Sequence, residues 1–129
     1  MNPVKSYRDL NVWQMAMTLA EKIYATTRAF PKEETYGLTN QIRRAVVSVP
    51  SNIAEGSARR NTAEFLNFLS IANGSLAEVE TQLLLATRLG FLLENQLREL
   101  EALTAETGRM LAGLRRALSE RKDQPGNRR

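Results

Sequence analysis

The chain has 129 residues and a formal net charge of +4, and 43% of its residues are hydrophobic. This length is typical of one domain, and the hydrophobic content is enough for a core that needs no disulfides or metals. Because the sequence contains no His and no Cys, it excludes the common zinc and iron ligand sets, Cys nucleophiles and His-based acid–base catalysis.

A first helix is predicted over residues 9–29, with Asp9 as its N-cap. Apolar residues recur there at alternating spacings of three and four, which is typical of the seam of a helical bundle. Trp13, Tyr24 and Phe30 fall on or near this stripe. We therefore expect these aromatic side chains in the core rather than as stacking platforms for nucleic-acid bases.

A second helix is predicted from Leu38 to about Glu55, with Gly56 as its C-terminal stop. Pro50 lies inside this segment. Proline cannot donate a hydrogen bond to the carbonyl of Val46 and it disfavours the helical conformation of the residue before it. The sequence therefore predicts a kink or a short break at Pro50.

Two longer helices are predicted in the second half of the chain. The third begins after Asn61, a good N-cap, and ends at Gly90, and the fourth covers residues 92–121. Residues 123–129 have no apolar side chain to bury, so we expect a disordered basic tail after a single domain over residues 1–122.

Four amphipathic helices with short turns predict an all-α fold, an up-down-up-down antiparallel four-helix bundle. The third helix carries more apolar side chains than one seam requires, and this surplus favours a homo-oligomeric interface. The side chains off its main stripe are Leu66, Phe68, Ile71, Leu84 and Leu85.

The positive charge is concentrated in two segments. Residues 43–60 hold four basic groups against one acidic, residues 108–129 hold seven against two, and the segment between them holds two against seven. These segments are interpreted either as solvated helix ends or as a surface for a polyanion such as RNA or DNA. The candidate nucleic-acid-binding residues are Arg43, Arg44, Arg59, Arg60, Arg115, Arg116, Arg121 and Lys122.

A polar stripe follows the second helix on the side opposite its apolar face. It consists of Gln41, Arg44, Ser48, Asn52 and Glu55. Such groups can hydrogen-bond across a subunit boundary and fix its register, bind a ligand or polyanion, or form an ordinary wet surface. We favour the assembly role among these three.

Small polar residues interrupt the third helix. Gly74 and Ser75 predict a notch that lets another helix approach closely. Glu78 and Glu80 follow, but side chains two positions apart on a helix point in different directions, so they form no catalytic dyad. We expect no enzyme activity, cofactor, metal or small-molecule substrate.

The first residues contain no apolar run of the kind that a signal peptide requires, and no segment is long enough to span a membrane. The sequence therefore predicts a cytoplasmic protein without membrane contacts.

The order and spacing of three stretches resemble the small four-helix-bundle family called the 23S rRNA-intervening-sequence proteins. The stretches are SYRDLNVWQMA, FPKEETYGLTNQIRRAVVSVPSNIAEGSAR and FLSIANGSLAEVETQL. The resemblance covers about residues 7–118, and the fold group includes the accessory variability protein of diversity-generating retroelements. It implies a homopentameric ring and, by the retroelement relative, nucleic acid and a reverse-transcriptase-like protein as partners.

The sequence thus predicts a non-enzymatic, oligomeric adaptor that binds nucleic acid or a ribonucleoprotein through its Arg-rich segments. The alternative is a scaffold for protein–protein assembly that has no nucleic-acid role.

Overall fold

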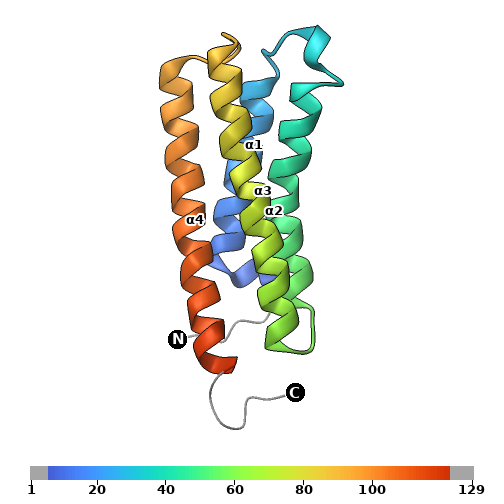
Figure 1. Cartoon of the computed structure of the whole chain (residues 1–129), viewed down its shortest axis with the longest axis vertical. Helices are drawn as coiled ribbons and strands as arrows, with labels where there is room; N and C mark the ends of the chain where they lie inside the picture. Colours follow the sequence, from blue (N-terminus) through green and yellow to red (C-terminus); the bar gives the residue numbers. More distant parts are fainter. Residues whose placement is uncertain (1–5, 123–129) are drawn as a thin grey trace.

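The computed structural model describes residues 6–122, which form four long α-helices, two short 3-10 helices and the connections between them (Figure 1). No strand occurs among them, so the predicted all-α class is confirmed. The predicted tail over residues 123–129 lies outside the described residues. In chain order the elements are η1 (Tyr7–Asp9), α1 (Asn11–Thr27), η2 (Lys32–Glu34), α2 (Leu38–Ser57), α3 (Thr62–Arg88) and α4 (Glu94–Lys122).

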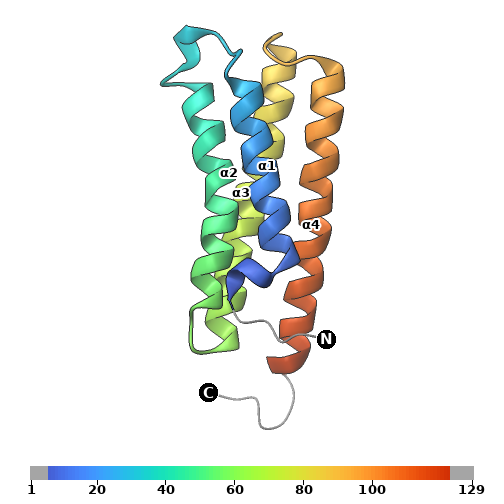
Figure 2. The same ribbon diagram turned by 180° about the vertical axis from the view of Figure 1, so that it is seen from behind.

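Consecutive helices run in opposite directions and lie side by side around one core (Figures 1 and 2). Each helix packs against two others, because α1 contacts α2 and α4, and α3 contacts the same two helices. In the described part of the chain, no Cα atoms of the diagonal helix pairs lie within 8 Å of each other. Short turns between amphipathic helices produce this order, since a short connection can join only neighbouring, antiparallel helices.

The start of α1 differs from the prediction. Asp9 is not its N-cap, because the Asp9 carboxylate accepts a hydrogen bond from the backbone N–H of Ser6 at 3.2 Å. The Ser6 hydroxyl in turn accepts one from the N–H of Arg8, and together these bonds form the turn η1. Helix α1 therefore begins two residues later, at Asn11, without a side-chain cap.

Helix α2 is continuous through Pro50, so the predicted alternative of a break is wrong, whereas the kink stays a prediction. Val46, Val49 and Ile53 are fully buried on either side of the proline, and this packing holds the helix together where a backbone hydrogen bond is missing. The prediction that Gly56 ends this helix is wrong. The glycine lies inside the helix, which ends at Ser57.

The ends of α3 follow the prediction. The Asn61 side chain accepts a hydrogen bond from the N–H of Glu64 at 2.8 Å, as an N-cap does. At the other end Gly90 adopts a positive φ of 81°, and the N–H of Phe91 bonds to the carbonyl of Ala86 at 2.9 Å. This pattern is the Schellman motif, which a glycine allows without strain.

The core lies between the four helices and is almost entirely apolar. Three of its buried threonines, Thr27, Thr104 and Thr107, each donate a 2.7 Å hydrogen bond to a carbonyl of their own helix. The prediction for the aromatic residues is partly wrong. Phe30 is buried, but Trp13 is only partly buried and Tyr24 is exposed, because both lie at the outer edge of α1. Among the described residues, no helix is both long and apolar enough to cross a bilayer.

We predict that Gly56→Ala destabilises the fold. An added Cβ would lie 2.8 Å from Cβ of Phe68 and 2.9 Å from a ring carbon of Phe65, so α2 and α3 would have to move apart. We expect this overpacking to outweigh the helix preference for alanine and to lower the free energy of unfolding by about 1–3 kcal/mol, measured in urea.

Gly113→Ala is the matched control, because a Cβ at this helical position meets nothing within 4 Å. It is expected to raise stability by up to about 1 kcal/mol. Equal effects of the two substitutions would show that Gly56 does not set the distance between α2 and α3.

Candidate nucleic-acid interface

Three arginines meet where α2 ends, α3 begins and α4 ends. Arg59, Arg60 and Arg121 line one hollow of about 160 Å³. Because α4 runs antiparallel to α3, its last turn lies beside the first turn of α3 (Figure 1). We call this part of the molecule the basic end. Asn61, Thr62, Phe65 and Leu118 complete its lining.

The Arg59 side chain is held in place by two contacts. Its guanidinium lies 4.7 Å from the centre of the Phe68 ring, and one of its nitrogens lies 3.6 Å from a carboxylate oxygen of Glu55. Both contacts are at the surface, where each contributes at most about 1 kcal/mol. They orient the guanidinium while leaving it accessible from solvent.

Helix ends add to the electrostatics of the basic end in two ways. The first turn of α3 lies in this region, where Asn61 caps the N–H of Glu64, and the positive end of the helix dipole favours an anion. Helices α2 and α4 end there as well, so their negative dipole ends are offset by the same arginines. The arginines thus stabilise the ends of both helices, and Glu64 in the first turn of α3 adds a negative charge beside them.

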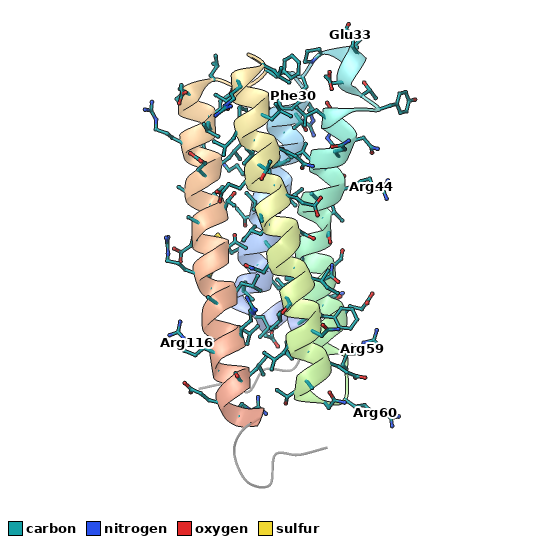
Figure 3. All side chains as sticks on the ribbon, viewed as in Figure 1. Phe30, Glu33, Arg44, Arg59, Arg60 and Arg116 are labelled. Atoms are coloured by element: carbon teal, nitrogen blue, oxygen red, sulfur yellow. The ribbon has the colours of Figure 1, made fainter. Side chains whose placement is uncertain are left out.

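The other candidate arginines do not all join this end. Arg116 projects away from α4 on the side opposite Arg59 and Arg60 (Figure 3). Arg115 donates to the hydroxyl of Ser70 on α3 at 3.4 Å. Lys122 is the last residue of α4, and its side chain lies outside the described residues.

Arg43 joins α1 to α2. Its Nε donates to the hydroxyl of Thr27 at 2.9 Å and an Nη donates to the carbonyl of Tyr24 at 3.3 Å. The guanidinium also lies 4.6 Å from the centre of the Tyr24 ring. These contacts place Arg43 in the fold itself, away from the basic end.

The polar stripe lies beside α3 and is partly satisfied within the chain. The hydroxyls of Ser48 and Ser75 are 2.8 Å apart, and the Asn52 amide donates to the carbonyl of Ser48 at 2.8 Å and to its hydroxyl at 2.9 Å. This network joins the middle of α2 to α3. Glu55, at the lower end of the stripe, faces Arg59.

The upper end of the stripe lines a polar groove of about 370 Å³ between α2 and α3. Arg44 projects outward there and makes no hydrogen bond or ion pair with the described residues (Figure 3). Oε1 of Gln82 is buried in this groove and has no partner within residues 6–122. The remaining side chains that line the groove are Asn40, Gln41, Ala45, Ser48, Ser75 and Glu78.

Of the two residues predicted to form a notch, only Ser75 lies at a contact between helices. Ser75 is buried at the contact with α2, whereas a Cβ at Gly74 would meet nothing within 4 Å in the described chain. The glycine that brings α2 close to α3 is Gly56.

A family model described as 23S rRNA-intervening sequence protein matches residues 8–113. The chain belongs to this family. The matched residues include Arg59 and Arg60 but end before Arg121, so the basic end of this chain combines a matched segment with the turns of α4 that follow it.

The fold of this family member also resembles a solved structure. A crystal structure of a protein from the S23 ribosomal protein family of Bacteroides thetaiotaomicron VPI-5482, described as having unknown function, superposes with a TM-score of 0.75. The two chains share 23% sequence identity, and the match covers 81% of this chain and 95% of the other. No curated protein gives a significant match.

Three features of the structure could not be predicted from the sequence. The contacts of Gly56 and Arg43 are made with side chains on other helices, and no local pattern reveals them. Arg121 and Arg60 line the same hollow because α3 and α4 have similar lengths and run in opposite directions. The nearly equal spans predicted for these two antiparallel helices were the only available signal.

We predict that Arg43→Ala destabilises this family member by about 1–3 kcal/mol. It removes charged hydrogen bonds and a cation–π contact that join α1 to α2. Arg44→Ala is the control at the neighbouring position, and we expect it to change stability by less than about 0.5 kcal/mol. Urea unfolding measures both variants, and a larger loss with Arg44→Ala would contradict the assignment.

Proposed function

We propose that this chain is a non-enzymatic, oligomeric four-helix-bundle adaptor that binds nucleic acid through its basic end. One observation carries the proposal. Arg59 and Arg60 are separated from Arg121 by an acidic stretch of sequence, yet all three line the same hollow beside the first turn of α3.

The chemistry of the arginine side chain suits phosphate. Each guanidinium has five N–H donors in a planar fork, which matches the oxygens of a phosphodiester. Phosphate contacts release counterions from the nucleic acid and carry little sequence information. The basic end therefore supports binding of an RNA or DNA backbone with low sequence preference and a steep dependence on salt.

The non-enzymatic part of the proposal rests on composition and on the absence of assembled acidic groups. With no His and no Cys in the sequence, metal binding would depend on carboxylates, and acid–base chemistry on carboxylates, Lys or Tyr. Within residues 6–122, no group of three or more such side chains is placed to hold a metal ion. This favours a binding role over a catalytic one.

A protein–protein scaffold without a nucleic-acid role is the second candidate function. The exposed apolar side chains of Ile71, Leu84 and Leu85 on α3 favour it. Its partner would be further copies of the chain, a homopentamer by the family resemblance, or a reverse-transcriptase-like protein. Nucleic-acid binding assays separate this candidate from the first.

We predict that replacing both Arg60 and Arg121 with Gln weakens binding to RNA and DNA of different sequences by similar factors. Fluorescence anisotropy with a labelled single-stranded RNA and a labelled DNA duplex, over a salt series, measures the effect. The slope of log K against log salt should become shallower by about one for each phosphate that the variant no longer neutralises.

Arg116→Gln is the control for the Arg121 substitution, since it removes one charge from the same helix at a position that points away from the basic end. It should retain most of the affinity and of the salt dependence. Absence of binding by the unmodified chain at low salt would favour the scaffold, and an equal loss in the control would place the interface elsewhere.

A further inference from the structure

The polar groove between α2 and α3 is a second site, separate from the basic end. Its volume is about 370 Å³, and the hydrogen bond between Ser48 and Ser75 lies at one end of it. Because α2 and α3 are antiparallel, Arg44 lies one turn before Ser48 and Glu78 one turn after Ser75. The two charged side chains therefore lie at the same level on opposite walls of the groove.

Arg44 and Glu78 have opposite charges but do not neutralise each other. Neither side chain makes an ion pair or a hydrogen bond within residues 6–122. Both are exposed at the rim of the groove, and Arg44 projects outward (Figure 3). A molecule that carries an anionic group and a cationic group can thus pair with both walls at once.

The floor of the groove contains a hydrogen-bond acceptor that has no donor. Oε1 of Gln82 is buried, and no described group donates to it. An unpaired buried acceptor costs free energy, and this cost is removed when a ligand supplies the donor. The last torsion of a glutamine side chain is soft, so a small rotation of the amide brings the oxygen to such a donor.

The serine pair at the end of the groove also retains an unused donor. Ser48 and Ser75 share one hydrogen bond, and the Asn52 amide donates to the Ser48 hydroxyl. Whichever serine accepts within the pair still has a hydroxyl hydrogen, which makes no hydrogen bond among the described residues. This hydrogen and the Arg44 guanidinium both favour an anion at that end.

The lining excludes several other classes of ligand. Ala45 is its only apolar side chain, so an apolar molecule would leave the polar groups without partners. No aromatic ring lines the groove, and a nucleobase would lack a surface on which to stack. Glu78 repels a phosphate backbone, and Arg44 repels a simple cation. These exclusions leave a small molecule with both charges.

We propose that this groove binds a small polar α-amino acid such as L-glutamine. The carboxylate of the amino acid pairs with Arg44, and its ammonium group donates to Glu78 and to Oε1 of Gln82. Its side-chain amide bonds to the amides of Asn40 and Gln41, which have no partner within residues 6–122. The amino acid is a ligand and not a substrate, and its binding does not depend on the proposed function.

An NMR titration of the full chain with L-glutamine, up to about 10 mM, tests the proposal. We expect saturable shifts of the backbone amides in residues 40–48 and 75–82, which form the two walls. N-acetyl-L-glutamine lacks the ammonium group and L-glutamine methyl ester lacks the carboxylate. Each derivative should bind about tenfold more weakly, because one charged hydrogen-bonding group is lost.

Substitution of the two charged residues tests the orientation of the ligand. Arg44→Gln and Glu78→Gln should each weaken the binding of L-glutamine about tenfold. Arg44→Gln should bind L-glutamine and its methyl ester equally, and Glu78→Gln should bind L-glutamine and its N-acetyl derivative equally, since each pair has lost the same contact. Arg116→Gln and Glu80→Gln are the matched controls outside the groove, and both should bind L-glutamine like the unmodified chain.

Gln82→Leu separates binding from folding. It removes the buried unpaired oxygen, so the free energy of unfolding in urea should stay the same or rise. Binding of L-glutamine should nevertheless become weaker. Unchanged affinity in this folded variant would contradict the role of Gln82.

Lack of saturation with the unmodified chain, derivatives that bind as tightly as L-glutamine, or equal losses in the controls would overturn the proposal. The variant with Gln at both position 60 and position 121 should bind L-glutamine normally while it loses affinity for RNA and DNA. Failure of one proposal is therefore distinguishable from failure of the other.

Discussion

The close approach of α2 and α3 is the constraint on which the rest of the structure depends. At Gly56 the backbone of α2 comes within reach of the Phe65 and Phe68 side chains, and further along the pair Ser48 and Ser75 share a hydrogen bond. A side chain at the first contact would force the two helices apart, and an apolar residue in place of Ser48 would remove the hydrogen-bond partner of Ser75. Together these two contacts fix the distance and the register of the central helix pair.

That register also determines where the charges lie. The connection between α2 and α3 is only four residues long, so Arg59 and Arg60 are held next to the first turn of α3. Helix α4 then returns along α3 and brings Arg121 to the same pole. A chain whose basic segments are separated by an acidic one thus becomes a bundle with a basic end. Of the intervening glutamates, Glu64 lies at this end, in the first turn of α3, whereas Glu94 lies in the first turn of α4, at the opposite end.

The helices themselves were predictable because their signals are local. The N-cap at Asn61 and the stop at Gly90 depend on residues within one or two turns, and apolar spacing marks the buried face of each helix. The predictions that were wrong have other causes. Asp9 bonds to Ser6 instead of capping α1, and Tyr24 is turned outward by the packing of α1 against its neighbours. The candidate arginines could be named from the sequence, but their division between the fold and the basic end is a property of tertiary packing.

The position of the basic end at a pole of the bundle has a consequence for binding strength. When elongated bundles associate along their sides in a ring with parallel axes, all of their basic ends lie on the same rim. A flexible polyanion that leaves one of these ends is then still held at its neighbours, and it rebinds at a high effective concentration. Under the proposed function, avidity of this kind would let a net charge of only +4 per chain retain a long nucleic acid while releasing a short one.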